Sequence, residues 1–259
     1  MNPFHFSPSE LQSQRIMAEP IIQIFKDIHE LSNVAARSFV DTANQAIGER
    51  GRFLVSLSGG NTPMKLYETL GSEFHDRVNW LNVHFFWGDE RCVPADDPGN
   101  CYGQAKKAFL DQVSAIKENI HRVESELKPA EAAYRYALTL KQFAEGSQAW
   151  PRFDLVLLGM GDDGHTASLF PGSPVDVSTP TLAVVANYQD RPANRVTLTQ
   201  NVFNSARNVN FLVAGKSKAE TLFNVLKGEY NPGLYPAQRI DPQDGTLTWL
   251  VDQDAASRL

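Results

Sequence analysis

The sequence predicts a doubly wound α/β domain built around one mostly parallel sheet. Short apolar runs alternate along the chain with segments whose apolar residues recur at helical spacing. Several of these runs are apolar throughout, which is typical of strands that helices cover on both faces. The length of 259 residues suits a single α/β domain, and the chain contains no internal repeat, low-complexity tract or long linker. We therefore expect one domain over residues 1–259, with residues 1–19 as an N-terminal lead-in.

Three units, each a strand followed by a helix, open the expected fold. The first is a strand at 20–25 and a helix at 31–49, in which Leu31, Phe39 and Ile47 recur at helical spacing. The second and third units consist of a strand at 53–57 with a helix at 63–70, and a strand at 81–87 with a helix at 103–113.

The second half of the chain continues this alternation. A helix is expected at 129–145, opened by Pro129, and the most apolar strand is FDLVLLG at 153–159. Further strands are expected at 181–187, 195–199, 209–215 and 247–251, with a helix at 217–226 and a loop at 231–238. Ligands of such sheets bind beyond the carboxyl ends of the strands. Polar clusters that are expected to share one pocket there follow Leu57, Trp87, Leu158 and Ala214.

The composition restricts the partners of this chain. Hydrophobic residues make up 42% and charged residues 21%, as in ordinary globular proteins, and the net charge is -6. That charge provides no field to attract nucleic acid or an anionic membrane, although a local basic pocket can bind a small anion. Cys92 and Cys101 are too few for a disulfide framework and lack a CxxC spacing. Without an apolar leader or span, we expect a cytoplasmic protein with free thiols.

The loop SGGNTP, residues 58–63, is a candidate phosphate site. Its two glycines let the backbone approach a ligand, Thr62 is expected to cap the following helix, and Pro63 suits the first helical position. Free N–H groups and the helix dipole favour a bound anion. The alternative is a tight turn that needs glycine only for packing. The candidate ligand-binding residues are Ser58, Gly59, Gly60 and Thr62.

GMGDDG, residues 159–164, matches GxGxxG after a strand, but we reject a dinucleotide site. The motif lies far from the first strand–helix unit, Asp162 and Asp163 would repel a pyrophosphate, and a Pro-Gly pair at 171–172 cuts short any helix. Asp163 and His165 suit acid–base chemistry, because the glycine between them lets the carboxylate approach the imidazole and raise its basicity. The alternative is that Asp163 caps a turn and His165 only packs.

Other polar residues are weaker candidates. Asp89 and Arg91 belong to an acidic and basic cluster after a strand, which forms either an ion-paired loop or a substrate-ordering pair. Arg195 and Lys218 lie at a strand start and a helix start, where they either bind an anion or are solvated. His84, inside an apolar strand, is expected to be a core or edge residue. The chain lacks GxSxG, HExxH and Walker motifs, which favours hydrolysis without a metal or a covalent intermediate.

The chain resembles the 6-phosphogluconolactonase family from about residue 20 to its C-terminus. The block at 153–172 is highly specific, and its order relative to the SGG and DER segments makes chance similarity a poor explanation. The matching segments are SLSGGNTP (56–63), FFWGDERCVP (85–94), FDLVLLGMGDDGHTASLFPG (153–172), RVTLT (195–199) and YPAQ (235–238).

The resemblance implies a modified Rossmann-like fold shared with glucosamine-6-phosphate deaminase and ribose-5-phosphate isomerase. It also implies a place in the oxidative pentose phosphate pathway and a phosphorylated sugar lactone as substrate. From the missing motifs and the expected mechanism we expect no metal and no cofactor. We expect a monomer or a weak homodimer. By this resemblance Gly59, Gly60 and Thr62 fall on the sugar-phosphate loop, Arg91 on the active-site arginine, Asp163 and His165 on the acid/base pair, and Arg195 and Lys218 on substrate anchors.

The expected mechanism is general-base hydrolysis of 6-phospho-D-glucono-1,5-lactone. Neutral His165 takes a proton from water as the water attacks C1, Asp163 orients the imidazole, and the imidazolium protonates the departing ring oxygen. Arg91 or backbone N–H groups stabilise the oxyanion. One alternative is a sugar-phosphate isomerase or deaminase with Asp89 as proton shuttle, but Phe170 stands where the deaminase relatives carry a glutamate. The other is a catalytically idle sugar-phosphate sensor.

Overall fold

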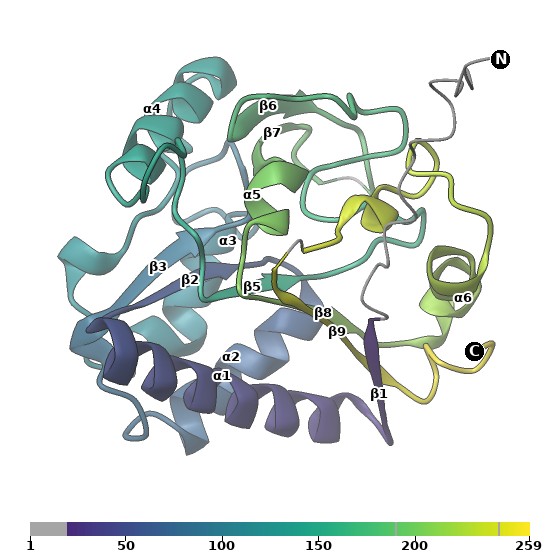
Figure 1. The fold of residues 1–259 in the computed structure, drawn as a ribbon, viewed down its shortest axis with the longest axis horizontal. Coiled ribbons are helices and arrows are strands. Elements are labelled where there is room, and N and C mark those ends of the chain that lie inside the picture. The colour runs from purple at the N-terminus through teal and green to yellow at the C-terminus, as the bar shows by residue number, and fades with distance from the viewer. Residues whose placement is uncertain (1–19, 190, 243) are drawn as a thin grey trace, which may run out of the picture.

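A six-stranded parallel sheet forms the centre of the protein in a computed structural model, which describes residues 20–189, 191–242 and 244–259 (Figure 1). The expected lead-in, residues 1–19, lies outside the described residues. In order across the sheet the strands are β1 (Ile21–Phe25), β9 (Thr246–Asp252), β8 (Asn208–Val213), β5 (Leu155–Leu158), β2 (Phe53–Leu57) and β3 (Val83–Trp87). Every neighbouring pair in this order is parallel.

Helices cover both faces of this sheet. One face packs on α1 (Ile28–Arg50), α2 (Asn61–Glu73) and α3 (Cys101–Ala105), which continues as a π-helical turn over Lys106–Leu110. The other face packs on α4 (Pro129–Lys141), α5 (Gln200–Asn204) and α6 (Ala219–Lys227).

Strand β5 shows how the two cores are separated. Leu155 and Leu157 belong to one core, whereas Val156 and Leu158 belong to the other, because successive side chains of a strand point to opposite faces. The doubly wound, mostly parallel α/β fold is therefore confirmed.

A second sheet departs from the expectation. The strands expected at 181–187 and 195–199 do not join the parallel sheet; they pair antiparallel as β6 (Thr181–Val185) and β7 (Asn194–Leu198). The third strand, β4 (Asp89–Arg91), forms where a polar cluster was expected, and it pairs antiparallel with β7. Gly88 joins the sheets, because its N–H donates to Leu57 O and its carbonyl accepts from Leu198 N, both at 2.8 Å.

Capping residues place the ends of α1. The Asp27 carboxylate accepts hydrogen bonds from His29 N and Glu30 N, so the helix begins at Ile28, earlier than the apolar spacing predicts. The helix ends at Gly51, whose φ of 73° is costly for other residues. In the described part of the chain, no helix combines the length and apolar character needed to cross a bilayer.

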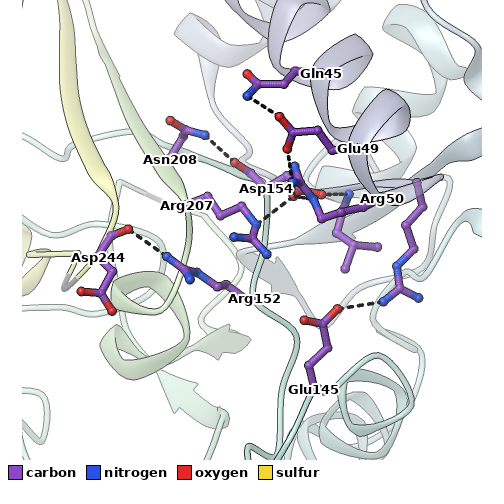
Figure 2. Close-up of polar contacts among 11 residues, drawn as sticks. Gln45, Glu49, Arg50, Glu145, Arg152, Asp154, Arg207, Asn208 and Asp244 are labelled. Atoms are coloured by element: carbon purple, nitrogen blue, oxygen red, sulfur yellow. Dashed lines mark hydrogen bonds and ion pairs between the residues drawn. The ribbon is translucent and has the colours of Figure 1, made fainter.

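An ion-pair network ties together the amino-terminal end of the sheet (Figure 2). Asp154, whose side chain is 4% exposed, accepts from Leu54 N at 2.8 Å and from Arg50 Nε at 3.1 Å. Arg207 Nε lies 3.3 Å from the same carboxylate, and Asn208 Nδ2 donates to Asp154 O. These contacts link α1, β2, β5 and β8 at the edge remote from the carboxyl ends of the strands.

Candidate active site

A cavity of about 300 Å³ opens at the carboxyl ends of the parallel strands. Its walls come from the β2–α2 loop, β4, the segment after β5, the turn after β6, β7, and the β8–α6 connection. All of the residues predicted for the site line this cavity except Asp163, which contacts His165 from behind. The four polar clusters of the sequence therefore meet in one place.

Gly60 shapes the loop between β2 and α2. It has φ of 105° and is the N-cap of a helix that begins at Asn61, so the prediction that Thr62 caps this helix is wrong. A residue with a side chain rarely adopts that φ, which explains why glycine holds the cap position. The backbone N–H groups of the first turn lack i–4 partners within the helix and are suited to an anion.

Close packing fixes the rest of this loop. A Cβ atom on Gly59 would lie 2.5 Å from Cys101 Sγ, so only glycine fits there. Ser58 is held by Tyr67, whose hydroxyl accepts from Ser58 N at 2.9 Å and donates to Ser58 O at 2.8 Å. The loop is therefore rigidly attached to α2 and to the start of α3.

The Asp163 carboxylate and the His165 imidazole form a short hydrogen bond. Asp163 Oδ1 lies 2.6 Å from His165 Nδ1 and also accepts from His165 N at 3.1 Å, so the pairing and the turn cap occur together. Burial would raise the pKa of Asp163, but its hydrogen bonds and charge interaction with His165 outweigh burial and hold it below its usual value. An ionised Asp163 keeps the proton on Nδ1, which leaves Nε2 as the acceptor.

Gly161 makes room for this pair, a role that sequence reasoning missed. A Cβ atom there would lie 2.0 Å from His165 Nδ1 and 2.6 Å from Asp163 Oδ1. Its N–H donates to His165 O at 2.8 Å, and its carbonyl accepts from Gly164, which has φ of 81°. The repeated glycines of GMGDDG were the available signal.

Two arginines face the cavity from the second sheet. Arg91 and Arg195 are directly opposite each other in the β4–β7 pair and are 6% and 2% exposed. Arg91 Nη1 donates to Gly99 O at 2.7 Å. Among the described residues, Arg91 Nε and both Nε and Nη2 of Arg195 are buried without a hydrogen-bond partner. Buried donors are rarely left unpaired in native proteins, so this arrangement is suited to an anionic ligand.

The other predicted polar residues are already partnered. Lys218 Nζ lies 2.6 Å from Asp162 Oδ1, which also accepts from Ser217 Oγ at 3.1 Å. Asp89 is buried, and its Oδ2 accepts from Ser168 Oγ at 2.7 Å. The Lys218 ammonium has three N–H donors, so it can contact a ligand anion while it keeps Asp162.

Sequence reasoning also missed the aromatic surroundings of His165. The ring centroids of Phe170 and Tyr188 lie 4.4 and 4.6 Å from the centroid of the imidazole. Arg191, in the same turn as Tyr188, adds a cation to the cavity wall. An aromatic and a basic residue between two strand candidates were the only local signal.

Glu90 anchors the start of α3 beneath Arg91. It is 1% exposed and accepts from the backbone N–H groups of Arg91, Cys101 and Tyr102 at 2.7–2.8 Å. Burial raises the pKa of Glu90 to about 7, although these three hydrogen bonds act in the opposite direction.

The described residues contain no group of three or more His, Cys, Asp or Glu side chains arranged to hold a metal ion. His84 is half-buried and its Nδ1 lies 3.1 Å from His121 Nε2. Burial, followed by the charge of His84, lowers the pKa of His121 to about 4. Neither histidine lines the cavity, as expected for a packed His84.

Comparisons with known proteins agree with this geometry. A family model described as glucosamine-6-phosphate isomerases/6-phosphogluconolactonase matches residues 26–249. The chain is 44% identical over 217 residues to a protein of Synechocystis sp. named 6-phosphogluconolactonase, covering 83% of this chain and 88% of the relative. A Haemophilus influenzae protein of the same name is 39% identical over 209 residues, covering 79% of this chain and 86% of the relative.

Solved structures extend the comparison. The crystal structure of devB protein has a TM-score of 0.84 and 32% identity, and the match covers 92% of this chain and 99% of that one. The 6-phosphogluconolactonase from Trypanosoma brucei has a TM-score of 0.79 and 27% identity, with coverage of 93% and 99%. A monomeric glucosamine-6-phosphate deaminase, at 23% identity and a TM-score of 0.80 with coverage of 92% and 100%, shares the fold.

Proposed function

This chain belongs to the glucosamine-6-phosphate isomerase/6-phosphogluconolactonase family, and we propose that it hydrolyses 6-phospho-D-glucono-1,5-lactone to 6-phospho-D-gluconate. The observation that carries this proposal is the hydrogen bond between Asp163 Oδ1 and His165 Nδ1, which leaves Nε2 without a partner among the described residues, at a cavity that Arg91 and Arg195 also line. The names of the relatives support a lactonase. The reaction is a step of the oxidative pentose phosphate pathway.

His165 is the general base of the proposed reaction. Nε2 takes a proton from a water molecule as its oxygen attacks C1, while Asp163 holds the ring and stabilises the imidazolium that forms. The bond from C1 to the ring oxygen then breaks, and the imidazolium returns its proton to that oxygen. Such acid–base assistance is typically worth about 10²–10⁴ in rate, which is adequate for a lactone that already hydrolyses slowly in water.

The cavity contains separate binding sites for the phosphate and for the developing oxyanion. The N–H groups at the start of α2, with Ser58, Gly59, Gly60 and Thr62 around them, form a seat for phosphate. Arg91 and Arg195 line the cavity and supply the positive charge that binds an anionic oxygen of the substrate. Lys218 lines the same cavity and adds a cation beside Asp162. These fixed contacts hold C1 near His165.

Two contacts among the described residues of the site count against the isomerase and sensor alternatives, and the residue at position 170 counts against a deaminase. Asp89, the proton shuttle that an isomerase would require, already accepts a hydrogen bond from Ser168. Phe170 stands where the resemblance places the glutamate of a deaminase, and it carries no proton to transfer. The intact Asp163–His165 pair counts against an idle sensor.

The direct test is hydrolysis of freshly generated 6-phosphogluconolactone by the purified protein with EDTA present. We expect turnover well above the spontaneous rate, loss of most of that turnover in His165→Asn, and no release of ammonia from glucosamine 6-phosphate. A wild-type rate equal to the spontaneous rate would overturn the proposed function.

The proposal also covers the cellular compartment and the oligomeric state of the enzyme. Cys92 and Cys101 are free thiols in the described structure, which suits a reducing cytoplasm. We place the enzyme there as a monomer or weak homodimer that acts without a cofactor. Sedimentation velocity at micromolar concentration tests the oligomeric state.

A further inference from the structure

One phenylalanine ring contacts both chemically important side chains of the cavity. The centroid of the Phe170 ring lies 4.4 Å from that of His165, with 31° between the ring planes. The guanidinium carbon of Arg195 lies 5.4 Å from the same Phe170 centroid. Phe170 comes from the loop after β5 and Arg195 from β7, so this ring links the two sheets at the site.

An apolar partner suits Arg195. The residue is 2% exposed, and the described residues provide no hydrogen-bond partner for its Nε or Nη2. A cation can rest on an aromatic face without using its N–H donors. A carboxylate or carbonyl at position 170 would instead accept from these donors and compete with the ligand. The ring therefore supports the guanidinium while leaving the donors free.

The Phe170 ring is also compatible with the gain and loss of a proton at His165. Among the described residues, the charged and titratable groups nearest this imidazole are Asp163 from its own loop, Tyr188 from the turn after β6, and Arg195 across the Phe170 ring. Asp162 from the same loop, Arg191 from the Tyr188 turn and Lys218 before α6 line the same cavity. Asp163 occupies Nδ1, and Phe170 lies against the ring with no polar atom that could occupy Nε2. An aromatic face also stabilises the imidazolium that forms when Nε2 takes a proton.

We propose that Phe170 is a positioning residue for the hydrolytic reaction, which aligns the base His165 with the ligand-binding Arg195 through its aromatic faces. This inference rests on the proposed function. It adds to that function a role for Phe170, which lies outside the acid–base pair and affects both the base His165 and the anion-binding Arg195.

The first test replaces Phe170 with leucine, which keeps the apolar volume but removes the aromatic face. We expect Phe170→Leu to raise KM roughly three- to tenfold as Arg195 loses its support. The pH at which kcat/KM reaches half its maximum should fall by roughly half a pH unit, because the protonated imidazole loses a stabilising contact. A purely structural role would lower activity without moving this midpoint.

Phe143 provides a matched control. It is also half-buried, its ring centroid lies 4.6 Å from that of His121, and the guanidinium carbon of Arg52 lies 6.0 Å from its centroid. None of these three residues lines the cavity. Phe143→Leu should therefore cost similar stability while leaving KM and the pH midpoint unchanged.

Fluorination of Phe170 tests the same idea without changing the packing. Incorporation of mono-, di- and trifluorophenylalanine at this position withdraws charge from the ring face, so the pH midpoint should fall stepwise with the number of fluorines. This series decides the question even if Phe170→Leu folds poorly. An unchanged midpoint across the series, or an equal shift in Phe143→Leu, would overturn the role of Phe170. An inactive wild-type enzyme would instead overturn the proposed function.

Discussion

His165 presents Nε2 to the cavity because Asp163 already holds Nδ1. For this single residue the two ring nitrogens have different tasks: Nδ1 orients the ring through Asp163, and Nε2 accepts the proton. We expect His165→Asn to lower kcat by roughly 10²–10⁴ while KM changes little, since asparagine cannot accept and return the proton. Steady-state kinetics with freshly generated lactone measure both constants. A near-normal kcat in this variant would exclude His165 as the base.

Asp163→Asn gives a pH-dependent prediction. The pKa of Asp163 lies below its ordinary value, so the carboxylate is charged throughout the working range and favours the protonated imidazole. An uncharged amide removes that support, and the imidazole then gives up its proton at a lower pH. The acidic limb of the kcat/KM profile should therefore shift to lower pH, with a smaller loss of kcat than in His165→Asn. If neither the limb nor the rate moves, Asp163 is only structural.

At the level of secondary-structure elements, the loop after β5 can hold His165 beside Asp163 only because Gly161 has no side chain. In Gly161→Ala the new Cβ atom would lie 2.0 Å from His165 Nδ1, so the imidazole must leave its position beside Asp163. We expect kcat/KM to fall roughly a hundredfold, because the base is misplaced. Gly48→Ala in α1 is the control, since a Cβ there meets nothing within 4 Å and Gly48 does not line the cavity. Equal kinetics for the two variants would contradict the role of Gly161.

Asp154, at the opposite end of β5, is expected to contribute to the stability of the fold and not to catalysis. Asp154→Ala removes the buried acceptor shared by Arg50, Arg207 and Leu54 N, and we expect the free energy of unfolding to fall by about 1–3 kcal/mol. Glu145→Ala removes an exposed partner of Arg52 and should change the free energy by less than about 1 kcal/mol. Urea unfolding measures both changes, and kcat should stay normal in each variant. An equal effect of the two substitutions would mean that the Asp154 network contributes little.

On the scale of the whole molecule, the cavity brings charged residues of the small sheet to the open end of the large one. Arg195 is buried, and among the described residues two of its nitrogens have no hydrogen-bond partner, an arrangement that costs stability until an anion binds. We expect Arg195→Met to raise the free energy of unfolding of the ligand-free protein by about 1 kcal/mol and to abolish catalysis.

Thermal melting with 6-phosphogluconate completes this test. The ligand should raise the melting temperature of the wild type, because it binds only the folded protein, and should leave Arg195→Met unchanged. Arg135→Met replaces an exposed arginine of α4 and should respond to the ligand like the wild type. A normal ligand response in Arg195→Met would exclude this residue from the anion seat.

Local patterns in the sequence were sufficient for much of the architecture and for the residues that gather at the site. The apolar run at 153–159 contains β5, with the acid–base loop directly after it, and Gly59 lies where a side chain would collide with Cys101. The incorrect capping assignment of Thr62 came from composition alone, which does not reveal that Gly60 adopts a positive φ.

The alternating α/β fold, the polar loops and the Asp163–His165 pair could be predicted from the sequence, because each depends on residues close together in the chain. The sequence did not predict that 89–91 forms β4, that β6 and β7 pair outside the parallel sheet, or that Arg91 lies opposite Arg195. Nor did it predict that Phe170 contacts both His165 and Arg195. Strand pairing and contacts between distant residues depend on how the whole chain buries its apolar surface, and no local pattern records that.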